Sequence, residues 1–105
     1  MKLGIDLGTT NTLVAIYEAG RPRLVPNTRG NIVTPSVVGL DGTGSFLVGD
    51  AARNQRVSAP DRTVENVKRM IGRRTTLGIG DHRLSPEEIS SLILRRVRDD
   101  ANAFL

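Results

Sequence analysis

Two strand-like runs joined by a very short polar turn constrain this fold more than any other feature of the sequence. Residues 2–7 are rich in apolar side chains, and residues 12–17 are apolar and β-branched. Between them lies Gly8-Thr9-Thr10-Asn11, in which glycine and asparagine are residue types that tolerate a tight reversal. The sequence therefore predicts an N-terminal β-hairpin closed by this turn.

The strand pattern continues to residue 49, and helical patterns follow it. Turn signals separate further expected strands at residues 21–25, 32–34, 36–40 and 46–48. Asp50 is a candidate cap for a short helix, and a second helix is expected from Asp61 or Arg62 to Gly72. Residues 73–83 show no period and are expected to form a loop. This order predicts a mixed α/β chain, strand-rich over 1–49 and helical over 50–72 and 85–105.

The clearest helix signal begins at Ser85. The segment Ser85-Pro86-Glu87-Glu88 combines a cap residue, a proline in the first turn and an acid three residues after the cap. Apolar residues then recur at helical spacing as far as Phe104. The sequence predicts a long helix here, and this explains Ser85 better as a helix cap than as a nucleophile.

The composition excludes several classes of site. The 105 residues include no cysteine, which rules out disulfides, thiolate zinc sites and a cysteine nucleophile. We find no secretory h-region and no run of roughly 18 apolar residues, so we expect a cytoplasmic protein without a membrane span. The net charge is +4, but only 3% of the residues are aromatic and no nucleic-acid-reading motif is present. This combination argues against a nucleic-acid partner.

The turn and the strand before it also carry the residue types of a phosphate site. Gly8 lets backbone N–H groups approach a phosphate closely, and Thr9 and Thr10 add hydroxyl donors. Asp6, two residues before the glycine, would hold the hydrated Mg²⁺ that accompanies a nucleoside triphosphate. The alternative is an ordinary hairpin turn with an exposed aspartate. The P-loop motif and the dinucleotide-binding glycine motif are both absent from the sequence.

Lys68 is the second candidate for a functional residue. On a helix ending at Gly72 it would lie beside an apolar stripe that includes Val64 and Val67. A lysine in that position either extends its amine to water or meets an anion, such as a γ-phosphate in its transition state. His82, the only histidine, lacks partner ligands and is expected to be a solvated loop residue.

Several motifs, taken in order, resemble the heat-shock protein 70 (DnaK-type) chaperone family. Gly4 to Thr12 is similar to the first phosphate loop of that family, and the similarity keeps its order over almost the whole chain. The further similar segments are Val25-Pro26-Asn27, Thr34 to Val38, Val48 to Ala52, Asn54-Gln55, Pro60, Thr63-Val64, Lys68 to Arg73 and Leu84 to Ser90.

This resemblance implies that residues 1–105 are an N-terminal fragment of an actin-like, ribonuclease-H-like ATPase lobe. Asp6 would organise the waters of Mg²⁺, and Lys68 would orient the attacking water and the γ-phosphate. The residues that match the family's contacts with the β- and γ-phosphates of ATP or ADP are Gly8, Thr9, Thr10 and Asn11.

Two features depart from long members of the family. Only nine residues separate Arg74 from Leu84, which resembles the HscC-like branch with its short insert. The chain also stops before the family's second phosphate loop, adenosine-binding segment and peptide-binding domain. We therefore expect residues 1–105 alone to be incomplete for hydrolysis and to self-associate through exposed apolar faces. Unfolded peptides, a J-domain co-chaperone and a nucleotide exchange factor would be partners of the full-length stress-response chaperone.

Two other functions fit the first loop. Sugar kinases, acetate-kinase relatives and bacterial actin-like filament proteins also use an Asp-x-Gly-Thr/Ser turn. They should differ from chaperones over residues 34–71, which here follow the chaperone pattern. A non-catalytic interaction module derived from such an ATPase is the third hypothesis.

Overall fold

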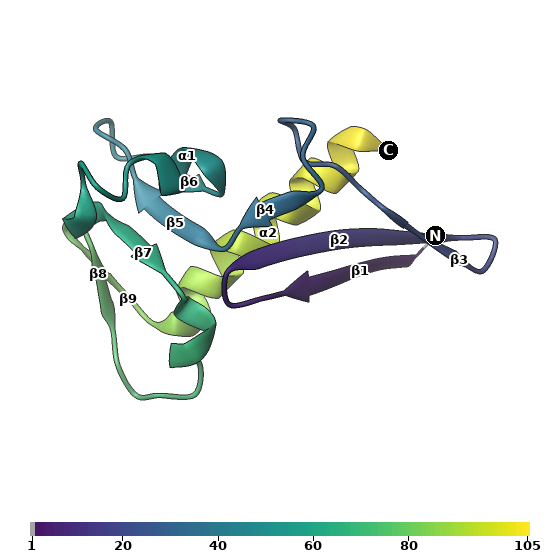
Figure 1. Ribbon diagram of the computed structural model, residues 1–105. Helices are drawn as coiled ribbons and strands as arrows, with labels where there is room; N and C mark the ends of the chain where they lie inside the picture. Colours follow the sequence, from purple (N-terminus) through teal and green to yellow (C-terminus); the bar gives the residue numbers. More distant parts are fainter. Residues whose placement is uncertain (1) are drawn as a thin grey trace.

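The predicted hairpin is present and forms part of the first, four-stranded sheet (Figure 1). In the computed structural model, which describes residues 2–105, β1 (Lys2–Leu7) pairs antiparallel with β2 (Asn11–Glu18). The other edge of β2 is shared by β3 (Arg21–Leu24), beside its second half, and β4 (Val33–Pro35), beside its first half. The predictions for these strands are therefore confirmed.

The second sheet follows after a single residue. Only Ser36 separates β4 from β5 (Val37–Leu40), which is the central strand between β6 (Phe46–Val48) and β7 (Thr63–Glu65). The short helix α1 (Asp50–Asn54) follows β6 and contacts β5. Its N-cap is Gly49, with no side-chain cap bond, so the prediction that Asp50 caps this helix is wrong.

The expected helix ending at Gly72 is also wrong. Two short 3₁₀ turns, η1 (Pro60–Arg62) and η2 (Val67–Met70), lie on either side of β7 instead. Thr63 and Val64 are β-branched and pair with β5, and a short isolated helix has little stability to compete with that pairing. Asn66 then adopts a left-handed conformation with φ of 57°, which breaks any helix through this segment.

The expected loop over residues 73–83 contains a small hairpin. β8 (Leu77–Ile79) pairs antiparallel with β9 (His82–Leu84), and Gly80 turns the chain with φ of 58°. Ile79 is fully buried in the core beside the second sheet. Three-residue strands are too short to show an alternating pattern, and this explains why the sequence did not reveal them.

One long helix joins the two sheets. α2 (Pro86–Phe104) begins with the predicted capping box, in which Ser85 Oγ accepts from the Glu88 N–H and Glu88 Oε1 accepts from the Ser85 N–H. It runs behind both sheets in Figure 1. Its first half packs Ile89 and Ile93 into a core with the second sheet, and its second half packs Val97 and Ala101 against the first sheet. The fold is thus a mixed α/β arrangement of antiparallel sheets followed by a helix, as expected for an N-terminal part of an actin-like ATPase domain.

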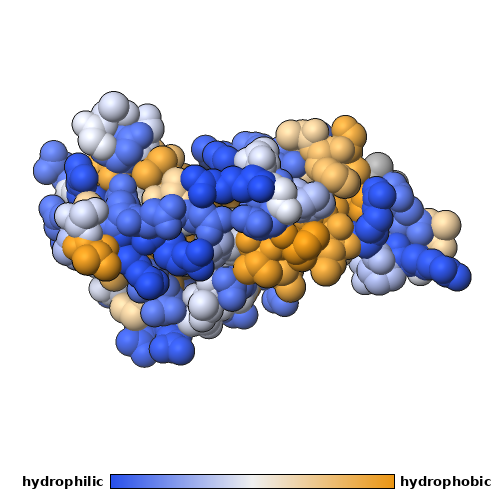
Figure 2. Space-filling view, turned by 45° about the horizontal axis from the view of Figure 1, so that its top comes forward, coloured by the Kyte–Doolittle hydropathy of each residue, from blue (hydrophilic) through white to orange (hydrophobic). Residues whose placement is uncertain are grey.

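The face of the first sheet opposite α2 stays uncovered. Alternation along β2 directs Val14 and Ile16 to the helix, so Leu13, Ala15 and Tyr17 point the other way. Figure 2 shows apolar side chains gathered over this part of the molecule. Across residues 2–105, no helix combines the length and the apolar character needed to cross a bilayer.

Candidate phosphate-binding site

The turn between β1 and β2 has a backbone that only glycine fits at its first position. The Gly8 N–H donates to the Asn11 carbonyl at 3.0 Å, which closes the turn around Thr9 and Thr10. A Cβ atom placed on Gly8 would lie 2.3 Å from that same carbonyl oxygen, far inside van der Waals contact. The glycine is therefore required by the close approach of two backbone segments.

Thr9 and Thr10 present unused donors in this turn. Within residues 2–105, neither their backbone N–H groups nor their hydroxyls have a hydrogen-bond partner. Neither residue is buried, so water satisfies these groups when no ligand does. Several N–H and O–H donors on one glycine-bearing turn form a concave site that suits a phosphate.

Ser36 holds the turn from the side of the β4–β5 junction. Its N–H donates to the Thr10 carbonyl at 2.9 Å, and its hydroxyl donates to the Gly8 carbonyl at 2.8 Å. The same hydroxyl lies 2.9 Å from Oγ1 of Thr12, and both of these side chains are buried. The turn is therefore fixed to the point where the chain passes from the first sheet to the second.

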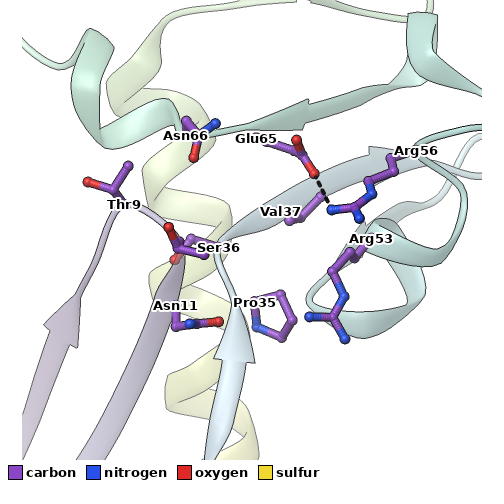
Figure 3. Close-up of a pocket in the computed structure, with 10 residues that line it drawn as sticks. Thr9, Asn11, Pro35, Ser36, Val37, Arg53, Arg56, Glu65 and Asn66 are labelled. Carbon is purple, nitrogen blue, oxygen red and sulfur yellow. Dashed lines mark hydrogen bonds and ion pairs between the residues drawn. The ribbon is translucent and has the colours of Figure 1, made fainter.

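A pocket opens in front of the turn, between the two sheets (Figure 3). Its first wall comes from the hairpin and the β4–β5 junction, and its second wall comes from α1, the segment after α1, and the end of β7. The residues that line it are Thr9, Thr10, Asn11, Pro35, Ser36, Val37, Arg53, Arg56, Glu65 and Asn66.

Two arginines give the second wall its positive charge. Arg53 Nη2 lies 3.0 Å from Asp50 Oδ1, and Arg56 Nη1 lies 3.0 Å from Glu65 Oε1, the pair drawn as a dashed line in Figure 3. The side chains of Arg53 and Arg56 are both about half exposed, so these ion pairs are screened by water. An anion in the pocket can compete with the carboxylates for these guanidinium groups.

Lys68 lies just outside this lining. It is exposed in η2, two residues after Asn66, which does line the pocket. Buried Val67 fixes the turn on the inside, and Glu87 of α2 holds its far end by accepting the Gly72 N–H at 3.0 Å. This hydrogen bond is the main reason that the pKa of Glu87 lies below its ordinary value. The structure thus places Lys68 on a well-held turn, with its side chain outside the lining of the pocket.

Asp6 occupies the open face of the first sheet. It stands opposite Leu13 in the register, and it lines a shallow hollow with Leu13, Tyr17 and Leu24 rather than the pocket in front of the turn. By alternation along β2, Asn11 shares this face with Leu13. No group of three acidic, histidine or cysteine side chains capable of holding a metal ion occurs among the described residues. One exposed carboxylate fits a hydrated Mg²⁺, which keeps most of its waters, and does not fit a dehydrated ion.

Sequence reasoning identified the turn but missed most of the opposite wall. Ser36 lies in Thr34 to Val38, one of the segments that carry the family resemblance, but the sequence indicates no role for it. Arg56 and Glu65 lie nine residues apart, and their meeting depends on β7 pairing with β5. No local signal in the sequence indicates that contact.

One comparison with known families adds to this geometry. The model of the family described as Hsp70 protein matches residues 2–105, which is nearly the whole chain.

Proposed function

The chain belongs to the Hsp70 family, and from that premise we propose that it forms the phosphate-binding start of the ATPase domain of a chaperone. The observation that carries the proposal is the β1–β2 turn, where Thr9 and Thr10 offer free donors in front of a pocket with two arginines on its far wall. ATP or ADP is the ligand that this chemistry and the family membership suggest.

Each candidate residue has a separate task in this proposal. The backbone N–H groups and hydroxyls of Thr9 and Thr10 bind the β- and γ-phosphates, with the backbone of Gly8 and Asn11 completing the turn. Lys68, on the turn after Asn66, orients the attacking water and supplies a positive charge to the γ-phosphate in the transition state. Asp6 would hold Mg²⁺ through the waters of the ion, and the ion when bound would supply positive charge to the phosphates.

We also propose that the protein is a short-insert, HscC-like member of the family. The β8–β9 hairpin is the entire connection between η2 and α2 apart from short polar segments. The proposal therefore assigns this protein no partner contact of the kind that long members make through their insert. Unfolded peptides, a J-domain co-chaperone and a nucleotide exchange factor are the partners proposed for the full-length protein.

The proposal is tested by comparing residues 1–105 with the full-length protein. We expect no measurable ATP hydrolysis by the isolated chain, because the family's second phosphate loop and adenosine-binding segment, which would complete the nucleotide cleft, are not among these residues. We expect the full-length protein to hydrolyse ATP at a rate that unfolded peptide stimulates, and to leave sugars unphosphorylated. ATP turnover by the isolated chain that Lys68→Ala abolishes would contradict the proposal, and so would sugar phosphorylation by the full-length protein.

We expect the isolated chain to self-associate through the uncovered face of the first sheet. Tyr17 and Leu24 are each 49% exposed on that face, beside a shallow apolar hollow. Introducing a charge there, with Leu24→Glu, should weaken association at least tenfold in sedimentation velocity across a concentration series.

Val57→Glu is the matched control for this prediction. Val57 is 87% exposed, more than Leu24, but lies after α1 and away from the sheet face. A chain that is monomeric at every concentration, or one that both substitutions dissociate equally, would show that this face does not drive association.

A further inference from the structure

Ser36 is a buried polar residue of the site that the proposed function leaves without a task. It is 2% exposed and forms the one-residue junction between β4 and β5. We propose that Ser36 is a positioning residue whose N–H and hydroxyl hold two carbonyls of the phosphate turn and thereby orient its N–H groups. This inference rests on the proposed function of the turn, and it assigns Ser36 no contact with a phosphate.

The two carbonyls that flank Thr9 both point toward Ser36. The Ser36 hydroxyl donates to the Gly8 carbonyl at 2.8 Å, and the Ser36 N–H donates to the Thr10 carbonyl at 2.9 Å. In a trans peptide the C=O of one residue and the N–H of the next point in opposite directions. Holding these carbonyls therefore turns the N–H groups of Thr9 and Asn11 away from Ser36.

This restraint matters because the turn has little else to hold its tip. The Gly8 N–H bond to the Asn11 carbonyl closes the base of the turn. Within the described residues, Thr9 and Thr10 donate no hydrogen bond that would fix their own peptide planes. The bonds from Ser36 therefore fix the two peptide planes that carry the Thr9 and Asn11 N–H groups before a ligand arrives.

Thr12 supports Ser36 without touching the turn. The hydroxyl of Ser36 has one hydrogen, and the Gly8 carbonyl can only accept, so that hydrogen goes to Gly8. The Thr12 hydroxyl, 2.9 Å away, must therefore donate to the Ser36 oxygen. Removing the Thr12 hydroxyl leaves the bond from Ser36 to Gly8 in place, which makes Thr12→Val a matched control for Ser36→Ala.

The experiment is ¹⁵N relaxation of the 105-residue chain and its variants, without ligand. In the wild type we expect rigid Thr9 and Asn11 amides, with order parameters of about 0.85. In Ser36→Ala the Thr9 value should fall below about 0.6, because the bond to the Gly8 carbonyl is lost, while Asn11 should stay rigid because the N–H of residue 36 still holds the Thr10 carbonyl. Thr12→Val and Ser36→Thr, which both keep the hydroxyl of residue 36, should stay close to the wild type. Unchanged order parameters in Ser36→Ala, or an equal drop in Thr12→Val, would overturn the inference.

Titration with inorganic pyrophosphate and Mg²⁺ provides a second measurement on the same samples. We expect the Thr9 and Thr10 signals to shift in the wild type, and the affinity to fall about tenfold in Ser36→Ala, the effect of one lost hydrogen bond. If the signals of the wild-type turn do not shift with pyrophosphate, the result contradicts the proposed function. The role of Ser36 is then still tested by the order parameters measured without ligand.

A double variant covers the case in which Ser36→Ala does not fold. Ser36→Ala with Thr12→Val removes both hydroxyls of the buried pair, so no buried hydroxyl is left without a partner. The double variant should show the same mobile Thr9 amide as the single one. A rigid Thr9 amide in a folded double variant would contradict the inference equally.

Discussion

Replacing Gly8 by alanine should lower ATP turnover by the full-length protein about a hundredfold, the size of effect expected when a binding group moves by about 1 Å. The new Cβ would lie 2.3 Å from the carbonyl oxygen of Asn11. That oxygen belongs to the backbone, and the position of the Cβ is fixed by the backbone of residue 8. Neither atom can rotate away as a flexible side chain would, so the turn itself must shift. The donors of Thr9 and Thr10 then lose their common direction.

The same substitution should also destabilise the isolated chain by about 1–3 kcal/mol, as overpacking commonly does, measured by urea unfolding. Gly4→Ala is the matched control, because Gly4 lies in β1, which leads into the turn, and its added Cβ would meet nothing closer than 3.9 Å. If Gly4→Ala and Gly8→Ala reduce turnover equally, the close approach at Gly8 is not what shapes the site.

The N-terminal hairpin was predictable because its information is local. The β-branched run of β2, the apolar run of β1 and the glycine between them lie within seventeen consecutive residues of the sequence, and the register follows from the short turn. The capping box at Ser85 is local in the same sense, since all of its bonds join residues three positions apart. Both features were read correctly for that reason.

The region around Lys68 was misread because tertiary pairing decided its structure. Val64 and Val67 are spaced as on a helix, yet Val64 pairs with Val38 of β5, which is 26 positions earlier in the chain. The periodicity of the sequence contains no information about such a distant partner. Pairing as the third strand of a sheet stabilises this segment more than its weak helical preference does. Lys68 therefore does not lie on the helix that the sequence predicts. It still lies close to the pocket along the chain, because it follows the pocket-lining residue Asn66 by two positions.

The two walls of the candidate site differ in the same way. Thr9 and Thr10 were identified from the turn, whereas Ser36 reaches the turn across 28 positions to Gly8. Arg56 lines the pocket because β7 brings Glu65 opposite α1 and the segment after it. The donors of Thr9 and Thr10 can thus be identified from the sequence alone. Only the fold shows that Ser36 holds their turn and that Arg56 lies across the pocket from it.

Lys68→Ala should reduce single-turnover ATP hydrolysis by the full-length protein on the order of 10²–10³-fold, the usual cost of removing one preorganised donor from a transition state. Its ammonium makes no ion pair with any residue of the described chain, so the charge is free to meet a γ-phosphate. Nucleotide affinity, measured separately by calorimetry, should change only a few-fold, because the turn amides still bind the phosphates. A loss of rate without a loss of affinity is what a role in the transition state predicts.

Arg69→Ala is the control for this prediction, because Arg69 is the next residue of the same turn and is also exposed. It has the same charge, so a general electrostatic effect of the basic surface would lower the rate in both variants alike. Lys68→Arg keeps the charge but replaces the compact ammonium with a planar guanidinium, and should recover only part of the rate. Equal rates for Lys68→Ala and Arg69→Ala would mean that the ammonium of residue 68 does not reach the reacting phosphate, and that the pocket in front of the turn binds nucleotide without it.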